Sequence, residues 1–477
     1  MPRGWEKLRN TAERGSENSL KNLAVMKFGG SLLDFSGTNI PLMVKRIREM
    51  KEAKDLGPLA VFSAPFGVTD RLQEIGEAKA LGRGYDLNPI FTSFLDLASN
   101  HARKNFIKEF QSQLGGHRRD VEETLLKIDR RFNGSIRAKV LTSGGEIPTA
   151  VLMSYILNSR NLESCYLGKR TWPIVTDDSF ENAMPDYELS RKRLSGLLGL
   201  IDGGGIVCIP GFLGLTHDGL ETVLGRGGSD QTAVFLSCLL RDRYEVETIL
   251  LKETPVQSAD PKIVKDQELR TIPVMTYNEA QKATVSGMTI VQNAAVRLAR
   301  SHKLPVTVAP ISDLGLGTVI QAEDLNPMIV KCVTGLDDCA MITMNNERSR
   351  SLEDCLRLWE GYDGFLDLGA EVMDTGEVVR DFLVLDANFV RRNEKQLRSF
   401  DREMRVEYGI GIVTLIGDKM STSSGIASAA IRSIPDVNIR RGVFAPHTSQ
   451  IILVLDEKDI SKAVKAIHHE LRKINRL

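Results

Sequence analysis

The chain has 477 residues, which is too long for one ordinary hydrophobic core, and roughly 150 residues per domain suggests about three domains. Its 62 basic residues balance 62 acidic ones, so no net charge favours binding to nucleic acid or to an anionic membrane. A hydrophobic content of 42% is typical of globular proteins.

The N-terminus and the cysteines bear on location. Residues 1–22 are charged and lack the apolar centre of a signal peptide, so we predict a flexible extension. No apolar run reaches the length expected of a membrane span. The six cysteines include no CxxC pair, which argues against a zinc site or a disulfide framework. We therefore expect a cytoplasmic protein with no protein-bound metal.

The first predicted strand, Leu23–Met26, leads directly into the sequence KFGGSLL. A strand, then Lys27, Gly29, Gly30 and Ser31, then a helix over about 38–53, is the order of a phosphate-binding loop. The Walker A order GxxxxGK[ST] is absent. A lysine beside two glycines also arises by chance, and that alternative stays open.

A second buried strand is predicted at Leu59–Phe62, followed by the loop SAPFGVTD. Ligands gather at the carboxyl ends of parallel strands, so Ser63 and Thr69 are expected to face the same crevice as Lys27. Ordinary turn and capping chemistry is the alternative.

Residues 89–139 are charged and helical in pattern, and we predict a helical lid or insertion there. The sequence LTSGGEIPTA follows, and an apolar helix is expected over 151–157. Glu146 stands at the helix start, where it either binds a substrate ammonium group or complements the helix dipole. A further helix is predicted over 188–198.

The stretch LGRGGSDQTA, residues 224–233, lies between a predicted strand at 206–212 and a predicted helix at 231–240. Arg226 is suited to a two-pronged hydrogen bond with a carboxylate or phosphate, and Asp230 is suited to orienting a cation. Glycines beside a helix N-terminus favour an anion. A tight turn capped by an aspartate is the competing interpretation.

A strand at Thr248–Leu251 runs into KETPVQSADPKI, where Lys262 follows a turn and is available to a phosphate. A helix at 294–301 and a strand at 306–309 complete the unit. Strands alternating with helices predict an α/β fold with a mostly parallel central sheet flanked by helices, ending near residue 320.

The remaining third contains an internal repeat. LVLD occurs at 383–386 and again at 453–456, and Met341–Met344 parallels Ile412–Leu415. The second copy has a βαββα order, with strands at 411–416, 437–441 and 451–455 and helices at 426–433 and 460–471. We predict two small α+β domains, at 321–400 and 401–477, after a domain at 23–320.

Seven motifs in one order resemble those of aspartate kinases in the amino-acid-kinase family. They are KFGGS, SAPFGVTD, SGGE, TDDSFENA, VCIPGFLGLTHDG, LGRGGSDQTA and SADPK. The two C-terminal copies resemble the family's paired ACT regulatory domains. The resemblance implies transfer of the ATP γ-phosphate to the β-carboxylate of L-aspartate, the first step toward lysine, threonine and methionine. It also implies allosteric control by an amino acid and a homodimer or larger oligomer.

The resemblance assigns a role to each candidate residue. Lys27 and Asp230 would be catalytic, and Mg²⁺ would arrive bound to ATP. Residues expected to bind aspartate are Ser63, Thr69, Glu146, Arg226 and Ser229. Residues expected to bind the nucleotide are Lys27, Gly29, Gly30, Ser31, Lys252, Asp260 and Lys262.

The chain departs from the family on the nucleotide side. LKETPVQSADPK replaces a pattern like TDVDGVYTADPR, and GMTIVQN replaces GAKVLHP, which puts Thr289 where a lysine is expected. In the first ACT copy, residues 345–352 lack the glycine-containing loop that the second copy keeps at 421–425. We therefore do not expect the first copy to bind an amino acid in the family's usual manner. Two alternatives follow: a regulatory paralogue without productive ATP binding, and a kinase for another acidic substrate.

Overall fold

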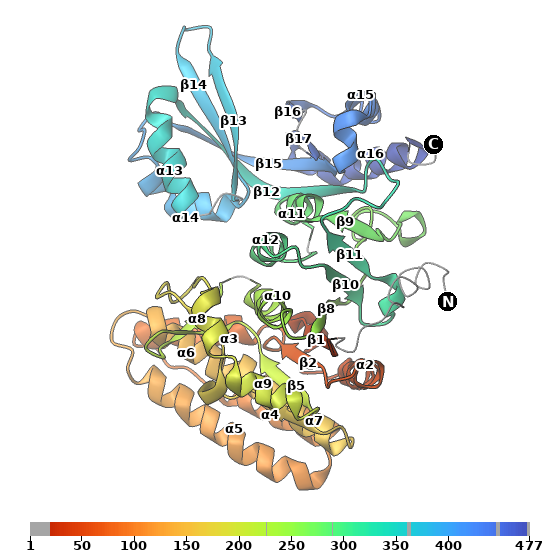
Figure 1. Cartoon of the computed structure of the whole chain (residues 1–477). Coiled ribbons are helices and arrows are strands. Elements are labelled where there is room, and N and C mark those ends of the chain that lie inside the picture. The colour runs from red at the N-terminus through yellow and green to blue at the C-terminus, as the bar shows by residue number, and fades with distance from the viewer. Residues whose placement is uncertain (1–19, 226, 289, 360–363, 445–448, 475–477) are drawn as a thin grey trace. The chain divides into compact units, whose positions relative to one another are not determined.

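The computed structural model describes residues 20–225, 227–288, 290–359, 364–444 and 449–474 (Figure 1). The chain divides into two compact units. Unit 1 comprises Met1–Met26, Leu33–Thr222 and Leu236–Thr248, and unit 2 comprises Lys27–Leu32, Val223–Phe235 and Ile249–Leu477. The domain boundaries predicted from the sequence stay predictions.

The largest sheet has eight strands in the order β3-β5-β2-β1-β8-β10-β11-β9. Its strands are β1 (Asn22–Phe28), β2 (Leu59–Phe62), β3 (Ser164–Tyr166), β5 (Ile206–Pro210), β8 (Glu245–Lys252), β9 (Val274–Thr276), β10 (Val306–Pro310) and β11 (Thr318–Gln321). The pairs β2–β5, β3–β5, β8–β10 and β9–β11 are parallel, and β10–β11 is antiparallel. The predicted α/β class is thus confirmed. Continuous apolar runs such as LAVF in β2 are typical of strands buried on both faces.

Unit 1 carries most of the helices. They are α2 (Ile40–Ala53), α3 (Val68–Ala80), α4 (Asn88–His101), α5 (Lys104–Leu125), α6 (Gly134–Gly144), α7 (Glu146–Ser159), α8 (Tyr187–Lys192) and α9 (Ser195–Asp202). The helical prediction for 89–139 is confirmed by α4, α5 and α6. The prediction of a single helix over 188–198 was wrong, because α8 ends at Lys192 and a second helix, α9, begins at Ser195. A small sheet of β4 (Val175–Thr176), β6 (Leu213–Thr216) and β7 (Glu221–Val223) was not predicted.

The segment Gly134–Ser159, which spans α6 and α7, is apolar and long enough to cross a membrane by length and composition alone. In the fold, 94% of its most apolar window is buried inside the protein. It therefore behaves as a core segment, interrupted at Gly145.

The C-terminal region of unit 2 contains two copies of a βαββα module, as the repeat predicted. The first has β12 (Cys332–Asn345), α13 (Ser349–Trp359), β13 (Phe365–Val372), β14 (Val378–Val384) and α14 (Ala387–Leu397). The second has β15 (Arg405–Ile416), α15 (Ile426–Arg432), β16 (Ile439–Phe444), β17 (Gln450–Asp456) and α16 (Ile460–Ile474). All six strands form one sheet in the order β13-β14-β12-β15-β17-β16.

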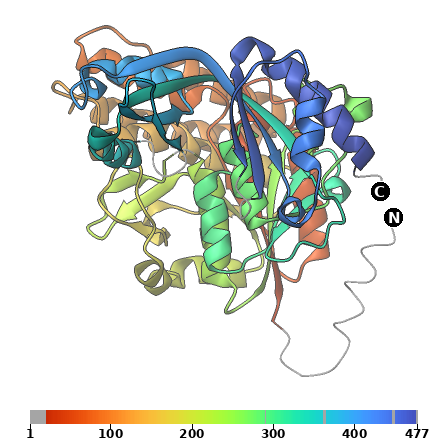
Figure 2. The same cartoon turned by 90° about the horizontal axis from the view of Figure 1, so that it is seen from above.

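Successive residues of these strands point to opposite faces of the sheet and pack into different hydrophobic clusters. In the second module Val413, Leu415, Leu453 and Leu455 pack with α15 and α16, which lie on one side of the strands (Figures 1 and 2). Residues that alternate with them along the strands, such as Ile412 and Val454, form a separate cluster on the opposite face.

Unit 2 also contains α10 (Gly228–Leu240, in part), α11 (Tyr277–Val285) and α12 (Asn293–Ser301). α11 begins with a capping box, in which Thr276 and Glu279 exchange side-chain and backbone hydrogen bonds. The Glu279 carboxylate also accepts a hydrogen bond from the Asp418 N–H at 2.7 Å. The start of α11 is thereby joined to the short helix Asp418–Thr422 that follows β15.

Lys331 is a fully buried cation at this junction. Its side chain is 0% exposed and forms ion pairs with Glu279 and, at 2.6 Å, with Asp324. Burial raises the pKa of Glu279, and Lys331 opposes that shift. The three side chains therefore depend on one another for charge compensation.

Replacing Lys331 with methionine should destabilise the fold by about 3–5 kcal/mol, because the fully buried Glu279 carboxylate would lose its cation and the partly buried Asp324 would lose its nearest one. The loss can be measured as a change in chemical unfolding. The control is Lys419→Met, whose partly exposed amine lies 3.7 Å from Asp324 and should matter by less than about 1 kcal/mol. Equal effects of the two substitutions would contradict this assignment.

Candidate active site

Two lysines and one aspartate form a buried ionic cluster in unit 2. Lys27 lies at the end of β1, Lys252 ends β8, and Asp230 lies in the first turn of α10. The Lys27 Nζ atom is 2.7 Å from Asp230 Oδ1, and the Lys252 Nζ atom is 3.5 Å from Asp230 Oδ2. β1 and β8 are neighbours in the sheet, so both amines are delivered at the carboxyl ends of adjacent strands.

The charges of this cluster are interdependent. Burial alone would raise the pKa of Asp230, but Lys252 and Lys27 hold it well below its usual range. Burial lowers the pKa of Lys27, Lys252 acts in the same direction, and Asp230 opposes them. The cluster holds two ammonium groups around one carboxylate, so it carries excess positive charge suited to a phosphate.

Two glycines lie close to this cluster. A Cβ at Gly29 would lie 3.5 Å from the Lys27 Nζ atom. Gly227 has a φ of +67°, and a Cβ there would overlap the side chain of Gln292. The Gln292 N–H donates to Asp230 Oδ2 at 3.3 Å, a contact that the sequence did not predict.

The other predicted residues of unit 2 differ in exposure. Ser229 is buried at the start of α10, and Ser31 is exposed in the short helix Gly30–Leu32. Asp260 accepts a hydrogen bond from the Lys262 N–H at 2.7 Å, which closes the predicted turn, and the Lys262 side chain is exposed. Arg226 and Thr289 lie outside the described residues.

Glu146 is a second buried acidic group, in unit 1. It is 4% exposed and begins α7, directly after the break at Gly145. Its carboxylate accepts hydrogen bonds from its own N–H and from the Ala64 N–H, and its Oε2 atom is buried with no hydrogen-bond partner in the described part of the chain. Burial raises the pKa of Glu146 to about 8. An unsatisfied buried carboxylate of this kind is suited to a cationic ligand group.

The glycine pair before Glu146 permits close packing. A Cβ at Gly145 would come within 2.9 Å of the Ala64 side chain, and one at Gly144 within 2.8 Å of Leu72. Ala64 belongs to the loop after β2 that carries Ser63, and Thr69 follows in the first turn of α3; both Ser63 and Thr69 are half-buried. The fold therefore holds SGGE against SAPFGVTD inside unit 1.

A further polar network in unit 1 was not predicted. The Glu221 carboxylate accepts hydrogen bonds from Thr142 and from Lys169, both at 2.7 Å. Thr142 lies in the last turns of α6, just before the break at Gly145. The pairing joins positions 52 and 79 residues apart, so sequence pattern alone gives no signal for it.

Comparison with known proteins bears on identity. A family model described as "Amino acid kinase family" matches residues 22–310, more than half of the chain. The chain belongs to the amino acid kinase family. The lysine-sensitive aspartokinase 3 of Escherichia coli K12 is 24% identical over 479 residues, covering 95% of this chain and 100% of that protein. An aspartokinase of Geobacillus stearothermophilus is 24% identical over 336 residues, covering 69% of this chain and 80% of that protein.

This chain has the same fold as E. coli aspartokinase III in its crystal structure in complex with aspartate and ADP. The TM-score is 0.74 at 20% identity, over 94% of this chain and all of that one. The agreement extends through the C-terminal modules, which supports their ACT-like assignment.

Proposed function

We propose that this protein is an aspartate kinase, which transfers the γ-phosphate of ATP to the β-carboxylate of L-aspartate and yields 4-phospho-L-aspartate and ADP. The observation that carries the proposal is the buried Lys27–Asp230–Lys252 cluster at the carboxyl ends of two adjacent strands. Family membership and relatives named as aspartokinases over nearly the whole chain support it.

The acceptor carboxylate needs no general base, because it is already ionised at neutral pH. One of its oxygens attacks the γ-phosphorus, and the bond to the β,γ-bridging oxygen breaks as ADP leaves. Catalysis then consists of alignment and charge neutralisation. Lys27 neutralises the transferred phosphoryl oxygens, and Asp230 orients the Lys27 amine.

Substrate recognition is divided among the remaining residues. Glu146 binds the aspartate ammonium group, and Arg226 binds its α-carboxylate. Ser63, Thr69 and Ser229 position the reacting end. Gly29, Gly30, Ser31, Lys252, Asp260 and Lys262 contact the nucleotide.

Mg²⁺ enters with ATP, since it binds substrate phosphates readily and retains several water ligands. Both oxygens of Asp230 already face lysine amines, so that carboxylate acts on Lys27 rather than on a metal ion. When bound, Mg²⁺ neutralises charge on the nucleotide phosphates.

A regulatory paralogue without catalysis is the second candidate, suggested by the departures in the nucleotide loop. The intact pairing of Lys27 with Asp230 argues against it, because ligand binding without phosphoryl transfer does not require that buried pair. No observation favours a different acidic substrate.

The ACT-like modules suggest oligomerisation and amino-acid control. Gly425 adopts a left-handed φ of +82° before α15, which explains the glycine in the second copy. The first copy instead has the polar turn Asn346–Arg348. We assign any effector site to contacts that involve the second copy, in a homo-oligomer. Six free cysteines fit a cytoplasmic location.

Formation of ADP tests the proposal. Purified protein should release ADP only when aspartate, ATP and Mg²⁺ are all present, and excess EDTA should stop the release. Binding of aspartate without ADP release would favour the regulatory paralogue instead.

A further inference from the structure

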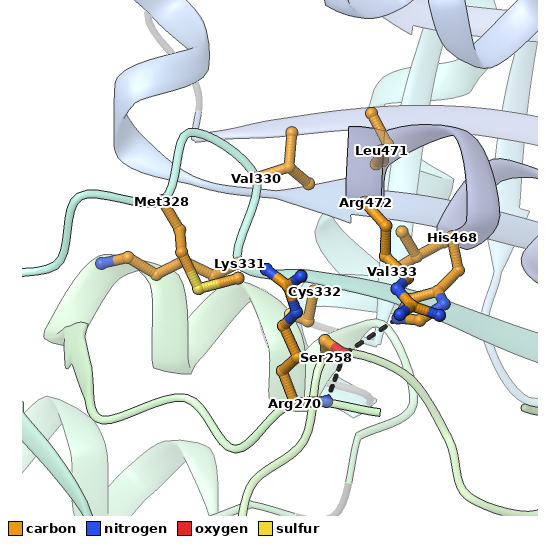
Figure 3. A pocket seen from close by; sticks show the side chains of 10 residues that line it. All are labelled: Ser258, Arg270, Met328, Val330, Lys331, Cys332, Val333, His468, Leu471 and Arg472. Atoms are coloured by element: carbon orange, nitrogen blue, oxygen red, sulfur yellow. Dashed lines mark hydrogen bonds between the residues drawn. The ribbon is translucent and has the colours of Figure 1, made fainter. Parts of the chain in front are cut away.

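Ser258 is a buried point of attachment in the segment between β8 and β9. Its N–H donates to the Arg270 carbonyl at 2.9 Å, and its hydroxyl accepts from the Arg270 N–H at 3.1 Å. Its carbonyl accepts from the Val333 N–H, in β12, at 2.9 Å. Its hydroxyl also lies 2.9 Å from His468 Nε2, in α16 (Figure 3). One serine thus joins the loop to the first strand of the first module and to the last helix of the second.

His468 is buried although it belongs to a terminal helix. Its side chain is 3% exposed, and its Nδ1 atom has no hydrogen-bond partner in the described part of the chain. The charged groups that face it are Arg472, Glu268, Arg270 and His469, and burial together with Arg472 lowers its pKa. The imidazole is therefore neutral at physiological pH, and its one hydrogen-bonded contact within the described chain is with Ser258.

The space around this contact is small. Ser258, Arg270, His468 and Arg472 line a cavity of about 10 Å³ (Figure 3). Such a cavity holds about one water molecule, so neither a nucleotide nor an amino acid fits. We therefore assign a structural role to the contact between His468 and Ser258, and no ligand to the cavity beside it.

Ser258 lies two residues before Asp260. The Asp260 carbonyl accepts hydrogen bonds from the Ile263 N–H at 3.0 Å and the Val264 N–H at 2.9 Å, which close a turn over residues 260–264. Ala259, between them, is fully buried and forms a bridge with Val333. A shift of Ser258 therefore moves the turn that carries Asp260 and Lys262 as a body.

We propose that His468 is a positioning residue for this turn: it acts through Ser258 to place Asp260 and Lys262 for the nucleotide. The C-terminal helix of the second ACT-like module, α16, then contributes to the affinity of the kinase for ATP. The inference rests on the proposed assignment of Asp260 and Lys262 to nucleotide binding.

His468→Ala should raise the KM for ATP about 5- to 10-fold, the effect of losing about one hydrogen bond. The kcat at saturating ATP and the KM for aspartate should stay within about twofold, since a single positioning contact for the nucleotide is lost. His468→Gln, which retains a hydrogen-bonding group, should restore most of the ATP affinity. His469→Ala is the matched control, because His469 is the adjacent, exposed histidine of the same helix and should leave every constant unchanged.

Ser258→Ala reports on the same contact without altering α16. The substitution also removes the hydrogen bond that this hydroxyl accepts from the Arg270 N–H, so it should raise the KM for ATP at least as much as His468→Ala, and the double variant should be no worse than Ser258→Ala. Additive losses, or an equal effect of His469→Ala, would overturn the inference, as would a loss of kcat with the KM for ATP unchanged.

Lys262→Ala separates this inference from the proposed nucleotide site. A raised KM for ATP in Lys262→Ala with no change in His468→Ala and Ser258→Ala would refute the positioning role alone. An unchanged KM in Lys262→Ala would refute the nucleotide assignment of the turn, and the positioning role with it.

Discussion

Lys27→Met should lower kcat by about 10²–10³-fold or more, while the Kd for aspartate changes by less than about threefold. In the proposed mechanism Lys27 supplies the positive charge that Asp230 orients toward the transferred phosphoryl group, and methionine keeps most of the length of the side chain without its charge. Steady-state turnover and calorimetric titration with aspartate measure the two quantities.

The fold should survive this substitution, because Lys252 remains 3.5 Å from Asp230 as a counter-charge. Lys45→Met is the control, since Lys45 is an exposed lysine of α2 and should retain full activity. Turnover that survives in Lys27→Met, in a protein with unchanged thermal unfolding, would refute the assignment of Lys27.

Glu146 should make aspartate affinity depend on pH. Its pKa is raised to about 8 by burial, so the carboxylate is largely protonated at neutral pH in the free protein. An ammonium group binds the ionised form, so kcat/KM for aspartate should fall about tenfold for each pH unit below 8 and level off above it. At saturating aspartate the bound ammonium lowers the pKa of Glu146, and kcat should vary less with pH.

Glu146→Gln should lower kcat/KM for aspartate by about 100-fold and abolish this slope, since the buried counter-charge is lost. Glu74→Gln, at an exposed glutamate of α3, should preserve both. A pH slope that persists in Glu146→Gln would show that another group binds the ammonium.

The sequence predicted elements well where buried residues form long runs. β2 was predicted residue for residue, and the βαββα repeat was recognised from the recurrence of LVLD. The strands β6, β7, β9 and β11 were missed because each of them mixes polar residues into a short apolar run, unlike the wholly apolar LAVF of β2. The break between α8 and α9 was missed although Ser195 and Gly196 are weak helix formers. Gly196 also lies against Thr171, where a Cβ would come within 2.8 Å.

Lys27 and Lys252 were predicted at the ends of two strands, and these strands are neighbours in the sheet. Lys27, Asp230 and Lys252 form one cluster, as parallel-sheet geometry requires. Partners separated by long stretches of chain gave no such signal. Ser258 and His468 are 210 residues apart, and Lys331 and Glu279 are 52 residues apart. Their pairing is decided by how the modules pack, and a single sequence does not encode that packing in any local pattern.

Trapping of an acyl phosphate distinguishes an aspartate kinase from a regulatory paralogue. The protein is incubated with Mg²⁺, ATP and hydroxylamine, and the hydroxamate is measured with L-aspartate, with L-glutamate and without an acceptor. We expect hydroxamate with L-aspartate, little with L-glutamate, and none in the Lys27→Met variant. Absence of hydroxamate from a folded protein that binds aspartate would contradict the kinase assignment and favour a regulatory paralogue.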